Sequence, residues 1–239
     1  MEILIAGSEK LGLTINSEQL EQFNIYYREL TTWNRRMNLT TITDYEEVQL
    51  KHFLDSLTIT LALGQHQVGT SLGIIDVGTG AGLPGLPLKI MLPETRLVLL
   101  EATAKKATFL HRLTDELGMV DVEIMTGRAE EIAHRSRYRE NFDRVLSRGV
   151  APMAALVELT LPFCAIGGSL IAQKKGRIEG EMNQATNAIS LLGGSLREVR
   201  RIKLEEFTDQ RQLIVIDKIS PTPLRYPRRP GIPARRPLV

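Results

Sequence analysis

The chain has 239 residues, and 43% of them are hydrophobic and 24% charged, as in a globular protein with one main core and an appendage. Its single cysteine, Cys164, excludes an internal disulfide, and no apolar run is long enough to predict a membrane-spanning helix. The first ten residues contain no secretory signal, so we expect a cytoplasmic protein, and the net charge of +2 by itself identifies no partner.

Residues 1–66 are predicted to form a helical cap. Asn16 or Ser17 is a suitable N-cap for a first helix in which apolar residues recur at spacings of three and four. Thr43 and Glu46 form a capping-box pattern in front of a second amphipathic helix. The two patterns predict a pair of helices that share an apolar surface.

A different pattern begins at about residue 72, where short β-rich runs alternate with helical segments. The expected strands are 72–77, 96–102, 122–126, 142–147, 168–173, 196–204 and 212–219. The expected helices are 86–91, 104–117, 129–138, 152–163 and 178–192. Alternating strands and helices predict a parallel sheet covered on both faces, and the last two strands, joined by a loop, predict an antiparallel pair at one edge.

This organisation predicts an α/β fold, the Rossmann-like seven-stranded sheet of class I methyltransferases with an N-terminal helical cap. The sheet domain would comprise residues 67–219, and a basic tail rich in proline and arginine would comprise residues 220–239. Six of the eleven prolines lie in that tail, and no acidic residue follows Asp217.

The glycine-rich loop after the first strand is the sharpest motif. It begins with Asp76 and contains Gly78, Gly80, Gly82 and Gly85. The last three also satisfy the dinucleotide fingerprint, in which a pyrophosphate approaches the loop. Asp76 would repel a pyrophosphate but attract a cationic sulfonium ligand. We therefore expect S-adenosylmethionine, bound by Asp76, Gly78, Gly80 and the apolar Leu83, and keep NAD as the alternative.

Further cofactor residues are expected at the ends of the next two strands. Glu101 ends the second strand, where a carboxylate can accept hydrogen bonds from ribose hydroxyls. Ala129 and Glu130 follow the third strand, where the adenine ring should lie.

The fourth strand ends at Ser147-Arg148, and its residue types restrict the acceptor atom. The Asn/Asp-Pro-Pro-aromatic motif of enzymes that methylate exocyclic amines is absent, and Cys164 lies in an apolar segment that indicates core. An acceptor that is already nucleophilic, such as guanine N7, needs neither a general base nor a covalent intermediate. Arg148 is then predicted to lie between cofactor and base, and the alternative is a purely structural arginine.

His52, Asp55 and Ser56 lie at i, i+3 and i+4, so they share one helical face. They could hold the target base of an RNA or position Arg148, or they could form a buried cluster that docks the cap. One histidine with one aspartate supplies too few ligands for zinc, and we expect no metal.

Basic residues of the C-terminal tail, with two lysines after the fifth expected strand that extend the same surface, predict contact with RNA phosphates, which would make the affinity fall with salt. The predicted residues are Lys174, Lys175, Arg228, Arg229, Arg235 and Arg236. The alternative is a solvated tail that only aids solubility. A small-molecule methyltransferase and a non-catalytic RNA-binding factor also stay open at this point.

Several motifs, in the same order, resemble those of the glucose-inhibited division protein B family of bacterial 16S rRNA guanine-N7 methyltransferases. The matching pieces are Trp33-Asn34, Asn38-Leu39-Thr40, His52-Phe53-Leu54-Asp55-Ser56, Asp76 to Gly85, Arg128-Ala129-Glu130, Ser147-Arg148, Lys175-Gly176 and Tyr226-Pro227-Arg228-Arg229. The resemblance implies an S-adenosylmethionine site that includes Gly78, Leu83, Ala129, Glu130 and Arg148. It also implies that the partner is 16S rRNA, as free RNA, small ribosomal subunit or assembly intermediate. Gly149 departs from the family, which usually has alanine there.

Overall fold

The mixed sheet is the frame on which the other elements are placed in the computed structural model, which describes residues 1–63 and 72–238. Its strand order is β3-β2-β1-β4-β5-β7-β6. The strands are β1 (Gly73–Val77), β2 (Arg96–Glu101), β3 (Val122–Thr126), β4 (Phe142–Arg148), β5 (Cys164–Lys175), β6 (Gly194–Ile202) and β7 (Arg211–Lys218). The first five are parallel, and β7 runs antiparallel to both β5 and β6. The predicted sheet and its antiparallel edge pair are confirmed.

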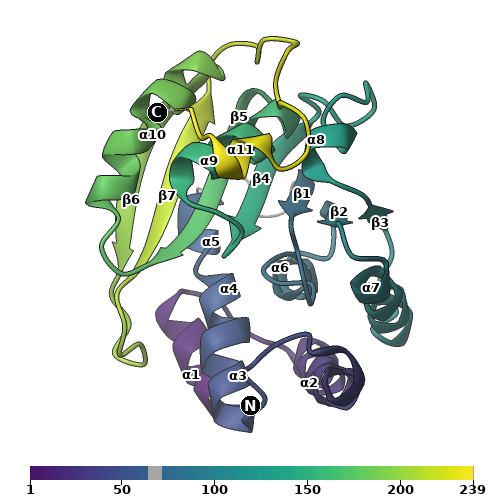
Figure 1. Ribbon diagram of the computed structural model, residues 1–239. Coiled ribbons are helices and arrows are strands. Elements are labelled where there is room, and N and C mark those ends of the chain that lie inside the picture. Colours follow the sequence, from purple (N-terminus) through teal and green to yellow (C-terminus); the bar gives the residue numbers. More distant parts are fainter. Residues whose placement is uncertain (64–71, 239) are drawn as a thin grey trace.

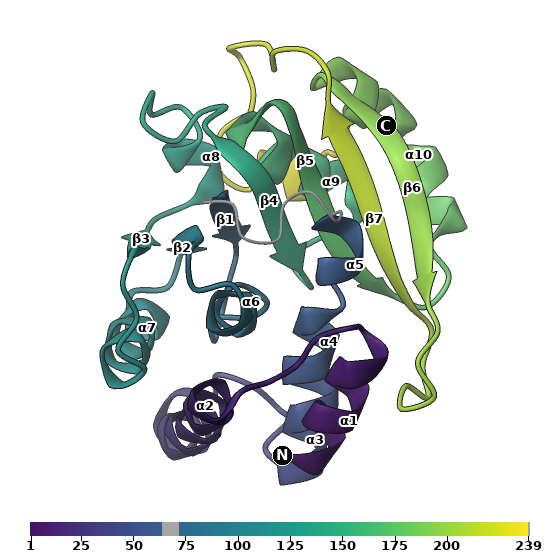
Figure 2. The same ribbon diagram turned by 180° about the vertical axis from the view of Figure 1, so that it is seen from behind.

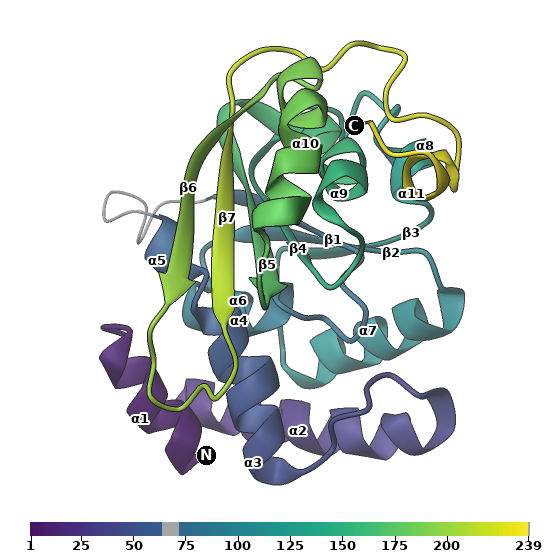
Figure 3. The same ribbon diagram turned by 60° about the vertical axis from the view of Figure 1, so that its left-hand side comes forward.

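Helices cover both faces of the sheet, as Figure 3 shows for α6 and α7 on one side and α9 and α10 on the other. They are α6 (Gly85–Met91), α7 (Ala104–Glu116), α8 (Ala129–Ile132), α9 (Met153–Thr160), the short 3-10 helix η3 (Leu161–Phe163) and α10 (Glu179–Leu191). Successive strand residues point to opposite faces, so Ile74 belongs to one hydrophobic core and Ile75 to the other.

The cap lies on the same face of the sheet as α6 and α7 (Figures 1 and 2). It consists of α1 (Glu2–Lys10), α2 (Ser17–Met37), α3 (Tyr45–Val48), the π-helix η1 (Gln49–Leu54), α4 (Asp55–Leu57) and α5 (Thr60–Leu63). Its apolar residues share one core with that face, because Phe23 and Phe53 are fully buried in the same cluster as Ile74. The predicted boundary between residues 66 and 67 lies outside the described residues.

The N-caps of the cap helices were predicted correctly in one of two cases. Asn16 caps α2 and forms a reciprocal capping box with Gln19. The Thr43–Glu46 capping box is wrong: Asp44 is the N-cap, and its carboxylate accepts the N–H groups of Glu46 and Glu47. An ionised carboxylate is the stronger acceptor at the positive end of a helix.

Three other segments differ from the prediction. The helix expected over 129–138 ends at Ile132 and continues as turns, in which Tyr138 is still buried. The second cap helix is interrupted by the π-helix. Strand β5 begins four residues earlier than expected, at Cys164, which is fully buried as predicted.

The tail crosses from β7 back over the domain and ends in the short helix α11 (Ile232–Arg235), which packs against α9 (Figure 1). Across residues 1–63 and 72–238, no helix is long and apolar enough to cross a membrane.

Candidate S-adenosylmethionine site and its arginine network

The glycine-rich loop is fixed from below by Asp76, the penultimate residue of β1. Its Oδ2 accepts hydrogen bonds from Thr79 Oγ1 at 2.7 Å and from the N–H of Gly85 at 2.9 Å. Gly78 has a φ of +73°, and a Cβ there would lie 2.6 Å from a methyl group of Val150. The loop therefore requires glycine at its first turn.

Asp76 also has the properties of a site for a cation. Its side chain is fully buried, and burial raises its pKa from 3.8 to about 6, against the lowering effect of the hydrogen bonds from Thr79 and Gly85. Its Oδ1 has no hydrogen-bond partner among the described residues. A buried carboxylate oxygen without a donor fits a positively charged ligand and does not fit a pyrophosphate.

Glu101 joins the ends of β1 and β2. Its two carboxylate oxygens accept the N–H groups of Gly80 at 3.0 Å and Thr103 at 2.8 Å. Each oxygen has a second lone pair, so the carboxylate can still accept hydroxyl donors.

A cavity of about 430 Å³ opens at the carboxyl ends of the parallel strands. Its walls there are Val77, Gly78, Leu100, Ala102, Gly127 to Glu130, Val150 and Ala151. Ligands of open α/β sheets bind at this edge. Of the predicted cofactor residues, Gly78, Ala129 and Glu130 line the cavity.

The other predicted cofactor residues do not line this cavity, and one of them, Arg148, lines a separate, smaller cavity together with Asp55 and Arg211. Asp76 and Glu101 are buried and accept N–H groups of the loop, whereas Gly80 is a half-buried residue of the loop that donates to Glu101. Leu83 is buried in the core on the cap side of the sheet, not on the cavity wall. Its place in the motif is explained by packing under the loop.

The cap contacts the same loop through Tyr26. This side chain is fully buried, and its hydroxyl donates to the carbonyl of Ala81 at 2.6 Å. Desolvation raises the Tyr26 pKa well above its usual value, so the phenol stays protonated and keeps its donor. The cap therefore helps to hold the loop in shape.

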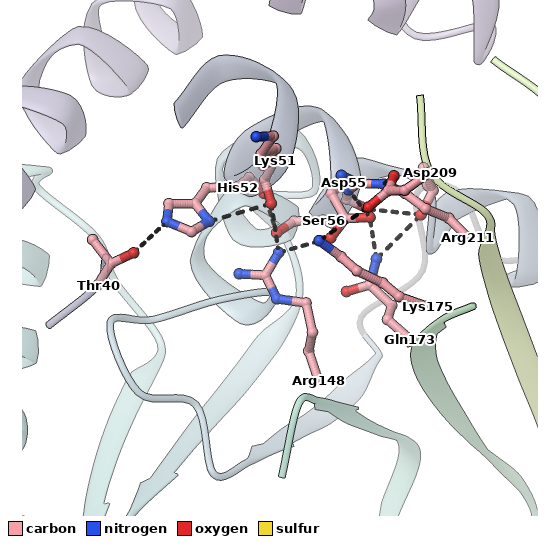
Figure 4. Close-up of polar contacts among 11 residues, drawn as sticks. Thr40, Lys51, His52, Asp55, Ser56, Arg148, Gln173, Lys175, Asp209 and Arg211 are labelled. Atoms are coloured by element: carbon pink, nitrogen blue, oxygen red, sulfur yellow. Dashed lines mark hydrogen bonds and ion pairs between the residues drawn. The ribbon is translucent and has the colours of Figure 1, made fainter. Parts of the chain in front are cut away.

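Arg148, at the end of β4, reaches into the cap and is held by Asp55 (Figure 4). Its Nη1 lies 3.0 Å from Asp55 Oδ2 and 3.3 Å from the carbonyl of Lys51. The other carboxylate oxygen of Asp55 lies 2.6 Å from Nη1 of Arg211. Asp55 thus pairs with two arginines from two different strands, β4 and β7.

Two residues of this network, Arg211 and Gln173, were missed by the sequence reasoning. Gln173 donates to the carbonyl of Asp55 at 2.5 Å and to Thr58 Oγ1 at 3.2 Å. Arg211 is almost fully buried, stacks on Phe207 with 4.0 Å between guanidinium carbon and ring centre, and pairs with Asp209. Neither residue belongs to a motif, and only the strand pairing reveals their contact with the cap.

His52 and Ser56 are buried, which favours the docking alternative over contact with RNA. The Ser56 hydroxyl is fully buried and donates to the carbonyl of His52 at 2.6 Å. The His52 Nε2 lies 2.8 Å from Thr40 Oγ1. Burial, reinforced by the charge of Arg148, lowers the His52 pKa to about 4, so the ring is neutral at neutral pH and offers no charge to a phosphate.

The predicted RNA-binding cations fall into two groups. Lys174 and Arg228 are engaged inside the protein, with Glu181 at 2.7 Å and Glu158 at 2.6 Å respectively. Their charges are therefore neutralised by internal carboxylates, which disfavours contact with RNA. Lys175 and the arginines at 229, 235 and 236 are exposed. Among the described residues, no group of three or more His, Cys, Asp or Glu side chains could hold a metal ion.

The sheet order, the acidic residue in front of a glycine loop and the cavity at that edge define a class I methyltransferase with S-adenosylmethionine as its cofactor. Solved structures agree on the fold. A precorrin-6y C5,15-methyltransferase from Geobacter metallireducens has a TM-score of 0.50 at 15% identity, over 69% of this chain and 87% of its own. A point mutant of MtNAS in complex with S-adenosylmethionine has a TM-score of 0.54 at 15% identity, over 91% and 77%.

Sequence comparison identifies the family. The family model described as "GidB: rRNA small subunit methyltransferase G" matches residues 19–214. A ribosomal RNA small subunit methyltransferase G from Dehalococcoides mccartyi is 51% identical over the full length of both chains. One from Moorella thermoacetica is 47% identical over 99% of this chain and 97% of its own. The chain therefore belongs to the GidB family of rRNA small subunit methyltransferases.

Proposed function

We propose that this protein transfers a methyl group from S-adenosylmethionine to N7 of one guanosine in 16S rRNA. The observation that carries the proposal is the cavity at the ends of β1 to β4, with the unpaired, buried Asp76 oxygen beneath its loop. The relatives are named as methyltransferases of the small-subunit RNA, which supports the substrate class. Such a substrate supports a cytoplasmic location.

The described residues suit a reaction that needs alignment more than proton transfer. S-adenosylmethionine supplies a methyl group that is already activated by a positive charge on sulfur. Guanine N7 has a free lone pair and no proton to remove, so the chain has to orient two reactants. Alignment alone can contribute about 7–11 kcal/mol to a barrier. The lowered pKa of His52 and its burial agree with a site that uses no histidine base.

Arg148 is the residue that we assign to positioning the base. It projects from the end of β4, and its Nη1 is committed to Asp55 and Lys51. Its side chain is 17% exposed and is therefore not completely enclosed by the protein. A planar cation held by a carboxylate can stack on or donate to a purine without moving.

The proposal is tested with methyl-labelled S-adenosylmethionine. The protein is incubated with free 16S rRNA and, separately, with small subunits, both from cells that lack the enzyme, and the label is mapped by cleavage at 7-methylguanine. We expect one labelled guanosine, and the better of the two substrates identifies the form of RNA that is used. The matched control is Gly78→Val, which should remove the label, because its side chain would overlap Val150. Label on small molecules but in no RNA would overturn the proposal.

A further inference from the structure

The tail forms part of the wall of the cavity at the sheet edge. Pro230, Gly231, Ala234 and Arg235 line it together with the loop residues Gly78 and Ala129 to Glu130. The sheet domain alone therefore does not enclose this space. The sequence reasoning placed the tail outside the domain as a basic appendage.

An ion pair with a buried carboxylate fastens the tail to α9. The Glu158 side chain is fully buried, and its oxygens lie 2.6 and 2.9 Å from Nη2 and Nε of Arg228. The backbone N–H of Arg228 donates to the same carboxylate at 2.8 Å. Removing the arginine would leave a buried charge without a partner, so this contact holds the tail strongly in place.

Two more side chains fix the backbone before and after the cis peptide bond of Tyr226–Pro227. The guanidinium of Arg139 donates to the carbonyls of Thr222 at 2.8 Å and Tyr226 at 2.9 Å. The His134 Nε2 lies 2.9 Å from the carbonyl of Pro227. The tail is thus a fastened segment and not a solvated extension.

The tail is also bonded directly to the loop after β3. The N–H of Gly231 donates to Glu130 Oε1 at 2.9 Å, and Gly231 has a φ of +80°, which favours glycine. Glu130 and its neighbour Ala129 occupy the end of the cavity where the adenine ring is expected. One oxygen of Glu130 is therefore bonded to the tail.

We infer that residues 230–235 belong to the S-adenosylmethionine site and close its adenosine end. The inference rests on the proposed function for the identity of the ligand. Ala234 is the most informative position, because its small side chain lines the cavity without taking part in the anchoring bonds. A larger side chain there would occupy space that the adenosine needs.

Binding of S-adenosylmethionine to the full-length protein, measured by calorimetry in the absence of RNA, tests this. Ala234→Phe should weaken binding at least tenfold. Two controls should stay within twofold of the wild type: Ala234→Ser, of nearly the same size, and Pro237→Phe, which adds the same ring at an exposed position of the tail outside the cavity lining. Thermal unfolding of all four proteins checks that each is folded.

A second measurement needs no variant. Trypsin can cleave after Arg235 but not after Arg229 or Arg236, which precede proline. S-adenosylmethionine should slow cleavage after Arg235 at least fivefold, while cleavage after Arg112, in α7, should stay unchanged.

The outcomes separate this inference from the proposed function. The role of the tail is overturned if folded Ala234→Phe binds S-adenosylmethionine like the wild type, or if the cofactor does not change the rate of cleavage after Arg235. Either result leaves the methyltransferase proposal intact. A wild-type protein that binds no S-adenosylmethionine overturns the proposed function itself.

Discussion

Asp76 both orders the glycine-rich loop and favours a ligand with a positive charge. Its Oδ2 orders the glycine loop, and its Oδ1 has no partner among the described residues. Because burial raises its pKa to about 6 in the folded chain, the charged form costs free energy in the absence of a ligand. The contribution of this group to folding stability is therefore present below pH 3.8 and is lost as the pH rises through about 6.

Cofactor affinity should show the opposite pH dependence. A cationic ligand binds the ionised form of Asp76, and this form disappears as the pH falls through about 6. We expect the dissociation constant for S-adenosylmethionine to be about tenfold higher at pH 5 than at pH 7. Asp76→Asn should bind more weakly at pH 7 and show a flat profile. A flat wild-type profile over this range would contradict the assignment.

At the scale of elements, one carboxylate joins the cap to two strands. Asp55, at the start of α4, pairs with Arg148 of β4 and Arg211 of β7, and its side chain is 5% exposed. The cap also shares an apolar core with the sheet domain and donates hydrogen bonds from Gln19 to the carbonyl of Ile90 and from Gln22 to that of Leu117. Asp55 therefore holds Arg148 in position and ties the cap to both strands.

Loss of this carboxylate should destabilise the protein strongly. Asp55→Ala leaves two arginines without their buried partner, for which the expected loss is about 3–5 kcal/mol in the free energy of unfolding by urea. Asp209→Ala is the matched control, because Asp209 also pairs with Arg211 but is 42% exposed, and should cost at most about 1 kcal/mol. Equal losses for the two variants would count against a special role of Asp55.

The elements differ in how far their sequences determine them. Strand and helix alternation, the Asn16 cap and the glycine loop depend on local residue patterns, and these were predicted correctly. The π-helix at Gln49–Leu54 has no such local pattern and was not predicted. That Asp55 positions Arg148 was one of the alternatives predicted from the sequence, and the structure shows this pair. Its second partner could not be predicted, since Arg211 comes from a strand near the other end of the chain.

The candidate site was predicted unevenly for the same reason. Gly78, Ala129 and Glu130 were found because they follow strand ends, and strand ends meet at one edge of a parallel sheet. The role of the tail was missed, because nothing in a Pro-Arg sequence indicates that Arg228 would find the buried Glu158. Tertiary ion pairs of this kind carry no local signal.

At the scale of the whole molecule, the tail contributes residues both to the lining of the cavity and to the charged surface. Pro230, Gly231, Ala234 and Arg235 line the cavity, and the exposed Arg225, Arg229 and Arg236 lie outside its lining. These three arginines have no ion-pair partner among the described residues. A polyanion such as rRNA is the partner that this charge favours.

These three arginines should contribute to the affinity for RNA and to its dependence on salt concentration. Replacing Arg225, Arg229 and Arg236 by alanine should weaken RNA binding at least tenfold and reduce the log–log salt slope by about two. The control replaces Arg112, Arg137 and Arg201, exposed arginines elsewhere on the domain, and removes the same charge. The tail would have no role in RNA binding if its variant lost less than twofold in affinity, or no more than the control.

The position of the tail also implies an order in which the two substrates of the proposed reaction bind. RNA bound across the arginines would cover the segment that closes the adenosine end of the cavity. The methyl donor must then enter before the RNA, and the demethylated donor must stay until the RNA has left. Such an enzyme follows a compulsory order, in which S-adenosylhomocysteine competes with the donor alone and the free enzyme always meets its donor first.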